Sequence, residues 1–240
     1  MPLLANFLSP KHPSLKICGI TQSAEAEKLA ELGVPALGVN FWPQSKRFCS
    51  PEQASQFLPQ LKGKIVRVGV FVNNATEHAP ALMAQDCLDI IQLHGDETEE
   101  ELLSFLTQGF HVIRSLALKQ QQDLAQISEH YQSLTQPFDN RLTLLLDAHA
   151  PGVYGGTGET IDWPQANEFI QLAHPLPVLL AGGITPANAP QALEITKPAG
   201  LDIASGAEIE PGRKDFEKVE SLLTSTRASC LLYTSDAADE

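Results

Sequence analysis

Eight short runs of β-branched and leucine-rich residues recur along the chain and constrain its fold more than any other feature. Apolar runs of this length are typical of parallel strands that are buried on both faces. Amphipathic stretches lie between them, such as residues 23–33, where Gly33 predicts a helix end. The runs are LKIC (15–18), ALGVNF (36–41), VRVGVFV (66–72), LDIIQL (88–93), HVIRSL (111–116), LTLLLD (142–147), PVLLA (177–181) and LDIA (201–204).

Eight strand-helix units in 240 residues predict a single-domain (β/α)8 TIM barrel. A doubly wound open sheet is the alternative, but such a sheet usually carries GxGxxG after its first strand, and ICGITQS (17–23) lacks this motif. We expect an N-terminal extension over residues 1–14 and the barrel over residues 15–227. Residues 228–240 resemble the in-frame translation of a sequencing adapter, so we predict that they are a non-native tail.

Charge and cysteine content exclude several classes of function. A formal net charge of −13 disfavours binding to nucleic acid or to an anionic membrane, since both normally need clustered Lys and Arg. The four cysteines are scattered without a CxxC pair, so neither a disulfide framework nor a zinc site is expected. The chain shows neither a signal peptide nor an apolar run of membrane-spanning length. We therefore expect a cytoplasmic protein without metal.

Glycine-rich loops follow the last three predicted strands, at the edge where a barrel of this kind builds its active site. Glycine allows backbone N–H groups to approach a ligand closely, and the last barrel loops are the usual phosphate site of the fold. One such loop is weak evidence, but three on consecutive strands predict a phosphate site. Its candidate residues are Gly155, Gly156, Thr157, Gly158, Gly182, Gly183, Ser205 and Gly206.

An acid and a thiol end the sixth and first runs. Asp147 has no helix directly after it, which favours an acid–base role, whereas Asp162 immediately precedes a helix start and is predicted to be its N-cap. A lone buried cysteine is usually a small apolar filler, but Cys18 stands at a strand end beside a glycine, where its pKa can be lowered. Strand alternation places Lys16 on the same face. In a closed ring the first and sixth strands lie three places apart, so Cys18 and Asp147 are predicted to face each other across a small ligand.

Three further polar residues are candidates for substrate binding. Arg47 is either a solvated loop cation or a bidentate partner of a substrate carboxylate. Gln92 is the last residue but one of the fourth run, and His94, just beyond that run, either bonds the adjacent turn or lines the pocket.

Several motifs together resemble the phosphoribosylanthranilate isomerase family of tryptophan biosynthesis, over residues 15–226. These motifs are LKICGIT (15–21), ALGVNFWPQSKRFCSPEQA (36–54), VGVFVN (68–73), IQLHGDE (91–97), LLLDAHAPGVYGGTGETIDW (144–163), LLAGGITPANA (179–189) and SGAEIEPGRKD (205–215).

The resemblance implies an Amadori rearrangement of N-(5-phosphoribosyl)anthranilate to 1-(2-carboxyphenylamino)-1-deoxyribulose 5-phosphate, with no metal or organic cofactor. It implies that Cys18 is the general base, that Asp147 is the general acid, and that Arg47 lies near the anthranilate carboxylate. The glycine loops would then hold the phosphate. One departure is Ala204, where the family usually has a serine before SG.

Two alternatives stay open at this stage. The first is another barrel enzyme acting on a phosphoribosyl substrate in amino-acid biosynthesis. The histidine-pathway isomerase would be expected to have Asp at the position of Cys18, and indole-glycerol-phosphate synthase a catalytic lysine network. The second is a noncatalytic barrel that binds a phosphorylated metabolite, which would need the glycine loops but not Cys18 and Asp147. In each case the expected partner is a small phosphorylated molecule, and the expected state is a monomer or a homodimer.

Overall fold

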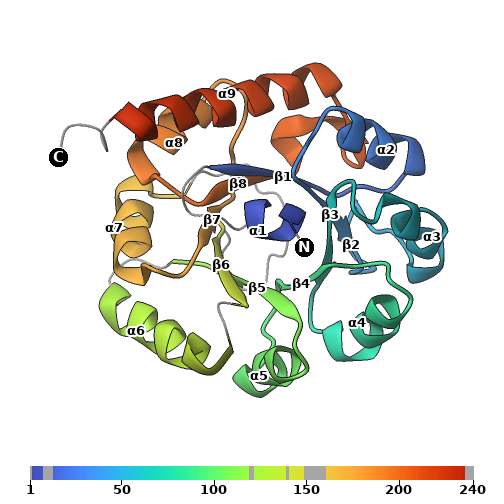
Figure 1. The fold of residues 1–240 in the computed structure, drawn as a ribbon, viewed down its shortest axis with the longest axis horizontal. Helices are drawn as coiled ribbons and strands as arrows, with labels where there is room; N and C mark the ends of the chain where they lie inside the picture. The colour runs from blue at the N-terminus through green and yellow to red at the C-terminus, as the bar shows by residue number, and fades with distance from the viewer. Residues whose placement is uncertain (1, 8–12, 119–121, 139–140, 149–160, 236–240) are drawn as a thin grey trace.

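The computed structural model describes residues 2–7, 13–118, 122–138, 141–148 and 161–235 and contains a closed barrel of eight parallel strands. The strands follow one another around the barrel in chain order, and β8 pairs with β1 to close it (Figure 1). The predicted (β/α)8 fold is therefore confirmed. The strands are β1 (Ser14–Cys18), β2 (Ala36–Asn40), β3 (Val66–Phe71), β4 (Ile90–Leu93), β5 (His111–Leu116), β6 (Leu142–Leu146), β7 (Val178–Leu180) and β8 (Gly200–Ile203).

Helices surround the strands, and several of them begin at residues whose side chains satisfy free backbone N–H groups. Thr98 and Glu101 form a reciprocal capping box at the start of α5. Asp162 accepts a hydrogen bond from the backbone N–H of Gln165, which confirms the predicted N-cap. The outer helices are α2 (Ser23–Glu31), α3 (Pro51–Phe57), α4 (Ala75–Ala84), α5 (Glu99–Thr107), α6 (Leu124–Thr135), α7 (Trp163–Ala173), α8 (Ala189–Thr196) and α9 (Phe216–Ser235), with short 3-10 turns η1 (Leu58–Leu61), η2 (Gln136–Phe138) and η3 (Ser205–Ala207).

Strand alternation sorts the side chains of β1 into two environments. Leu15 and Ile17 belong to the cluster between strands and helices, while Lys16 and Cys18 converge over Gly38 of the neighbouring strand. The predicted common face of Lys16 and Cys18 is therefore confirmed. A second apolar cluster fills the barrel interior and is formed by Phe7, Ala36, Val66, Val68, Ile90, Ile113, Leu145, Leu179, Ala181 and Ala199.

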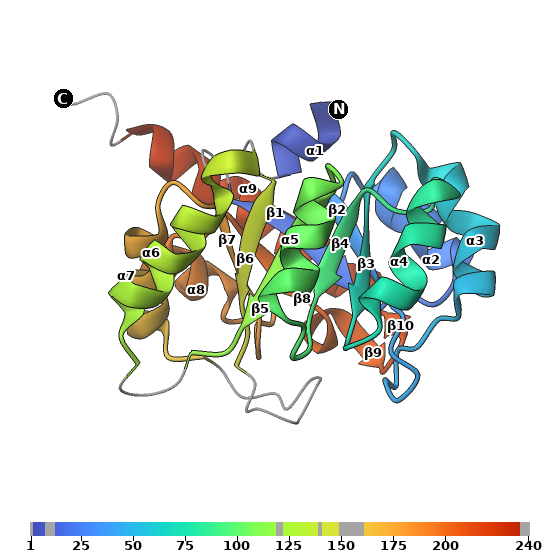
Figure 2. The same ribbon diagram turned by 90° about the horizontal axis from the view of Figure 1, so that it is seen from below.

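The N-terminal helix α1 (Pro2–Phe7) contributes to that interior cluster, a role the sequence did not predict. Phe7 is fully buried there, and Leu3 and Leu4 pack against the cluster. Figure 1 shows α1 over the centre of the barrel, and Figure 2 shows it at the edge opposite to the β9–β10 hairpin. The extension therefore covers the amino-terminal end of the barrel, away from the carboxyl ends of the strands.

Two other elements depart from the sequence-based boundaries. A short antiparallel hairpin, β9 (Glu208–Glu210) with β10 (Arg213–Lys214), follows β8 and was not predicted. Helix α9 continues to Ser235 and crosses the boundary expected at residue 227. The assignment of residues 228–240 as a non-native tail remains a prediction.

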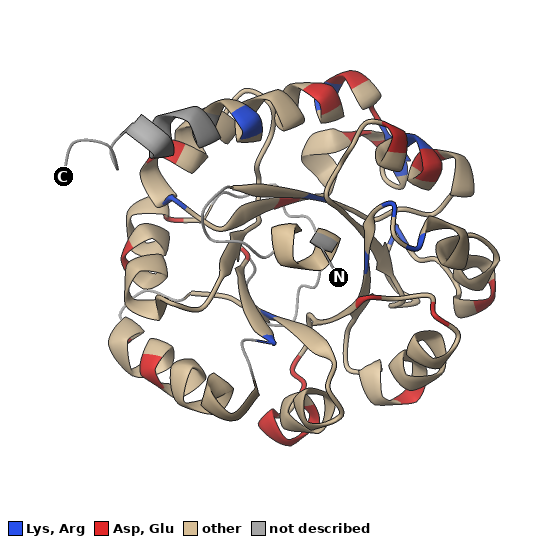
Figure 3. Ribbon diagram, in the orientation of Figure 1, with Lys and Arg blue, Asp and Glu red and all other residues tan. Residues whose placement is uncertain are grey.

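Charged side chains are scattered over the outer helices, where Asp and Glu outnumber Lys and Arg (Figure 3). Among the residues that the structure describes, no helix is long and apolar enough to span a bilayer.

Candidate active site

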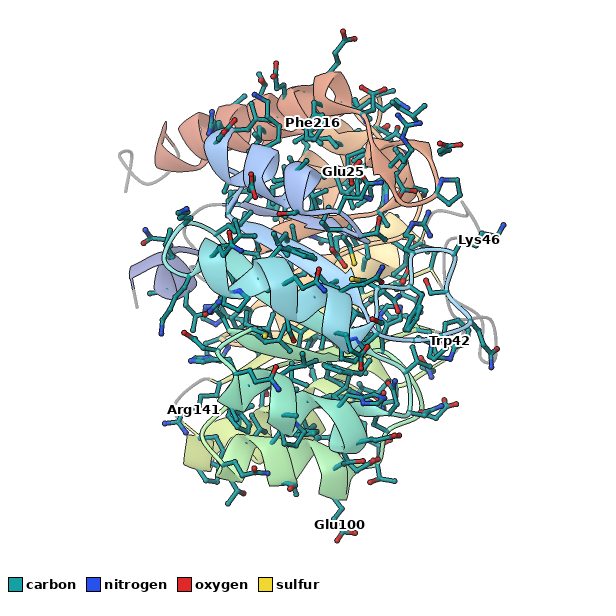
Figure 4. The ribbon with its side chains drawn as sticks, turned by 90° about the vertical axis from the view of Figure 1, so that its right-hand side faces the viewer. Glu25, Trp42, Lys46, Glu100, Arg141 and Phe216 are labelled. Carbon is teal, nitrogen blue, oxygen red and sulfur yellow. The ribbon has the colours of Figure 1, made fainter. Side chains whose placement is uncertain are left out.

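The carboxyl ends of the strands bring the predicted acid and base to one end of the barrel. Cys18 is the last residue of β1, and Asp147 directly follows β6, three places away around the closed ring. In Figure 4, Trp42 and Lys46, from the loop after β2, lie at the edge opposite to Arg141, which immediately precedes β6. The site is therefore built on the face where strands end and loops begin, as expected for this fold.

Asp147 is held by polar groups on both of its carboxylate oxygens. Its Oδ1 accepts a hydrogen bond of 2.7 Å from the backbone N–H of Ala148, and its Oδ2 lies 3.4 Å from Nε2 of His94. On the other side of the ring, Nδ1 of His94 lies 2.6 Å from Oγ of Ser115 and 3.1 Å from Nε2 of Gln92. His94 therefore links Asp147 to the ends of β4 and β5, and its contact with a substrate remains a prediction.

Cys18 occupies a strongly charged environment. Its backbone carbonyl accepts a hydrogen bond of 2.6 Å from Nζ of Lys214, and its side chain converges with that of Lys16 over Gly38. Burial raises the pKa of the Cys18 thiol above its ordinary value, while the charges of Lys16 and Lys214 act in the opposite direction. The chemistry available at this position therefore depends on how far the nearby lysines stabilise a thiolate.

Arg47 is oriented by a carboxylate from the β9–β10 hairpin. Its Nε and Nη2 donate to the two carboxylate oxygens of Glu208 at 2.8 and 2.6 Å, and Glu208 also accepts a bond of 2.7 Å from Lys214. Burial alone would raise the pKa of Glu208, but Arg47 and Lys214 hold it below its usual value. A bidentate pair of this kind fixes the guanidinium in direction as well as in charge.

The loops after β7 and β8 meet, as the predicted phosphate site requires. A Cβ atom on Gly206 would collide with the backbone carbonyl oxygen of Ile184, so only glycine permits this contact. Gly182 and Gly183 adopt φ values of 79° and 62°, which glycine reaches without strain. A Cβ on Gly182 would lie 3.1 Å from Oδ1 of Asp147, so this loop also borders the acid.

The remaining glycine site falls outside the described residues. Gly155, Gly156, Thr157 and Gly158 are in this part of the chain, and their contribution to phosphate binding remains a prediction. Ser205 begins the 3-10 turn η3 and is exposed, so it lies beside Gly206 at the rim of the site.

Sequence reasoning missed the residues that support the predicted ones. Glu208 and Lys214 both belong to SGAEIEPGRKD, a motif that was recognised for its glycines and serine but whose charges were given no role. Glu97 is also buried and accepts hydrogen bonds from the Asn73 backbone, the Gly95 backbone and the Arg114 guanidinium, which ties the ends of β3, β4 and β5 together. Its only local signal was a position just after IQLHGD.

Within the described ranges, no three His, Cys, Asp or Glu side chains are arranged to hold a metal ion. Chemistry without metal or organic cofactor stays a prediction from the resemblance.

Comparison with known proteins gives a consistent result. The family model for N-(5'-phosphoribosyl)anthranilate (PRA) isomerase matches residues 15–225. An N-(5'-phosphoribosyl)anthranilate isomerase from Rippkaea orientalis is 41% identical over 213 residues, which cover 88% of this chain and 94% of the relative.

Solved structures extend the likeness to three dimensions. Phosphoribosyl anthranilate isomerase from Thermotoga maritima superposes with a TM-score of 0.76 at 30% identity, covering 90% of this chain and 99% of that one. A phosphoribosyl anthranilate isomerase in complex with reduced 1-(o-carboxyphenylamino)-1-deoxyribulose 5-phosphate superposes with a TM-score of 0.73 at 28% identity, with the same coverage.

Proposed function

The chain belongs to the N-(5'-phosphoribosyl)anthranilate isomerase family, and from that premise we propose that Cys18 is its general base and Asp147 its general acid. The protein is an aldose–ketose type isomerase of tryptophan biosynthesis, which converts N-(5'-phosphoribosyl)anthranilate to 1-(2-carboxyphenylamino)-1-deoxyribulose 5-phosphate. The observation that carries the residue assignment is the placement of Cys18 and Asp147 at carboxyl strand ends three places apart in the ring.

The reaction begins with two proton transfers, one to the ring oxygen and one from C2, and both of these atoms are bonded to C1. Asp147 donates its proton to the furanose ring oxygen, the bond from that oxygen to C1 breaks, and a Schiff base forms between C1 and the anthranilate nitrogen. Cys18, as a thiolate, then removes the proton from C2, and the electron pair moves to give an enolamine. Tautomerisation of the enolamine yields the ketone, so the conversion consumes no oxidant or reductant.

The surroundings of the two groups suit these roles. His94, 3.4 Å from Asp147, fixes the carboxyl group within the site, and Ala148 binds its other oxygen. Cations lie near Cys18 instead, and the charges of Lys16 and Lys214 both act to lower the pKa of its thiol. A base is favoured where cations stabilise its anionic form.

Arg47 is proposed to bind the anthranilate carboxylate through the edge that Glu208 leaves open. A guanidinium has five N–H donors, and Glu208 takes Nε and one hydrogen of Nη2. The fork formed by Nη1 and the second hydrogen of Nη2 can then bind another carboxylate in a bidentate pair. Glu208 therefore determines the direction in which Arg47 presents this fork.

The phosphate is proposed to lie against the loops after β7 and β8. Gly182, Gly183, Ser205 and Gly206 supply backbone N–H groups there, and contact between Gly206 and Ile184 holds the two loops together. The change from serine to Ala204 removes one hydroxyl donor from this region but no backbone donor. Gln92 and His94 complete the proposed substrate contacts. A cytoplasmic location and a monomeric or homodimeric state remain predictions.

Turnover of freshly generated phosphoribosylanthranilate, followed by loss of its fluorescence, tests the residue roles. Replacing a general acid or base should lower the rate by about 100-fold to 10,000-fold, so we expect losses of this size in Cys18→Ser and Asp147→Asn. Cys87→Ser and Asp162→Asn are matched controls. Cys87 is buried just before the amino-terminal end of β4, away from the carboxyl ends of the strands, and asparagine is as good an N-cap as aspartate. Rates near those of the parent in both test variants would reject the assignment.

A further inference from the structure

A buried ion pair lies directly beneath Cys18 inside the barrel. Lys16 is fully buried, and its Nζ lies 2.8 Å from Oδ1 of Asp202, whose side chain is only 7% exposed. The two residues face each other in register across the β1–β8 pair that closes the barrel. A buried ion pair contributes little to stability by itself, because removing both charges from water offsets most of their attraction. Its position therefore suggests a role in the function of the site.

Gly38 shows how closely the pair approaches the thiol. A Cβ atom on Gly38 would lie 2.8 Å from Sγ of Cys18 and 2.9 Å from Nζ of Lys16, so the two atoms converge over a position that has no side chain. The Lys16 ammonium is hydrogen-bonded to Asp202 and interacts electrostatically with Cys18. A carboxylate, an ammonium and a thiol thus follow one another from the buried ion pair to the partly exposed Cys18.

Other charges also face Cys18, from β10 and from the loop after β2. Lys214 binds the Cys18 carbonyl, and the Arg47 guanidinium interacts electrostatically with the thiol. Glu208 bonds both of these cations, and its single negative charge offsets one of their two positive charges. Lys16 is the cation whose side chain converges with the thiol over Gly38, and Asp202 is the anion bonded to Lys16.

We propose that Lys16 is a positioning residue that holds the Cys18 sulfur and stabilises its thiolate, and that Asp202 keeps Lys16 charged while limiting that stabilisation. The catalytic meaning of this arrangement rests on the proposed role of Cys18 as base. A base works best when its pKa lies near the operating pH, because a strongly stabilised anion accepts a proton weakly. With Asp202 in place the thiol faces a nearly neutral ion pair, and without Asp202 it would face a bare ammonium.

The directions of the pKa shifts agree with this division of roles. Burial raises the pKa of Cys18, Lys16 lowers it, and Asp202 raises it again. Burial alone would lower the pKa of Lys16, but Asp202 and Cys18 together raise it above its ordinary value, so Lys16 stays charged at neutral pH.

The test is the pKa of Cys18, measured from the pH dependence of its alkylation by iodoacetamide and read on the Cys18 peptide by mass spectrometry. Cys49 does not interfere, since burial raises its pKa to about 11 and its peptide is separate. An opposite charge at close range typically shifts a pKa by about 1–3 units, so Lys16→Met should raise the Cys18 pKa by that amount. Asp202→Asn should lower it, and the limb of the kcat/KM profile that titrates with Cys18 should move in the same direction in each variant.

The opposite signs separate an electrostatic role from a structural one, because general loosening of the site would move both variants in the same direction. If Lys16→Met fails to fold with Asp202 left unpaired, the double variant K16M/D202N carries no buried charge and is compared with D202N, where the loss of Lys16 should again raise the pKa. An unshifted Cys18 pKa in K16M or in this comparison, or a rise in D202N, would overturn the inference.

Alkylation requires no turnover, so this result is independent of the proposed function. The expected pKa shifts together with parent-like turnover in Cys18→Ser would retain the Lys16–Cys18 pairing and reject the base assignment. Unshifted pKa values with a large loss of rate in Cys18→Ser would retain the base and reject the role of Lys16.

Discussion

Replacement of Phe7 by alanine should destabilise the barrel without changing its activity. Phe7 is fully buried in the interior cluster, which also contains Val66, Val68, Ile90 and Ile113, and its helix α1 lies at the edge of the barrel opposite to the β9–β10 hairpin. Truncating a buried phenylalanine to alanine typically costs about 3–5 kcal/mol, from lost burial and from the cavity left behind. For a domain of about this length, 1 kcal/mol lowers Tm by about 2–4 °C, so a fall in Tm of about 6–20 °C is expected.

The loss has an upper bound set by the docking of α1 itself. If α1 detaches when Phe7 is truncated, the cost equals the free energy with which the whole helix binds the barrel. A variant lacking residues 2–7 gives that limit, so the free energy of unfolding of Phe7→Ala should fall between those of the parent and the deletion. The helix has six residues and is too short to be stable without this contact.

Urea unfolding followed by circular dichroism measures these differences, with turnover assayed on the same samples. Asn6→Ala is the matched control, since Asn6 is exposed on the same helix and surface changes usually stay within about 0.5 kcal/mol. The value of kcat/KM should be unchanged in Phe7→Ala below its unfolding transition, because α1 lies at the opposite end of the barrel from the site. If Phe7→Ala lowers the free energy of unfolding by less than about 1 kcal/mol, the interior of the barrel is stable without Phe7. If kcat/KM of the folded variant falls strongly, the amino-terminal end of the barrel is coupled to the active site.

Three further outcomes follow from individual contacts. Gly206→Ala should separate the β8 loop from the Ile184 carbonyl, and a displacement of about 1 Å in a substrate-positioning loop costs about 100-fold in kcat/KM, measurable by steady-state kinetics. Thr98→Ala removes the α5 capping box and should lower the free energy of unfolding by about 1 kcal/mol in urea titrations. The pKa of Glu208 is lowered in the folded state, so its contribution to stability is present above its unfolded pKa of about 4.3 and is lost as the pH falls through the folded pKa. The urea midpoint of Glu208→Gln should therefore respond less to acidification than that of the parent.

The sequence predicts the barrel well because each strand and each outer helix carries its own local pattern. Apolar runs mark the buried strands, and capping residues such as Thr98 and Asp162 mark helix starts. Helix α1 carries no such pattern, since PLLANF is shorter than two helical turns. Its helical structure depends on the packing of Phe7 in the interior cluster. The β9–β10 hairpin is likewise held by Arg47, which lies 161 residues before Glu208 in the chain. Local patterns therefore predict the framework, while elements stabilised only by distant contacts require the structure.

The same distinction explains why Lys16 was placed correctly while its partner was not predicted. Alternation along β1 places Lys16 and Cys18 on one face, but Asp202 is 186 residues away, and its position opposite Lys16 depends on the register in which β8 closes the barrel. A slip of one residue would place Leu201 or Ile203 opposite Lys16 and leave a buried ammonium without its carboxylate. Leaving one member of a buried ion pair alone costs about 3–5 kcal/mol, which is a large fraction of the stability of a typical domain. The ion pair beneath Cys18 therefore also favours the observed register of closure, so its two residues contribute to the specificity of the fold as well as to the environment of the thiol.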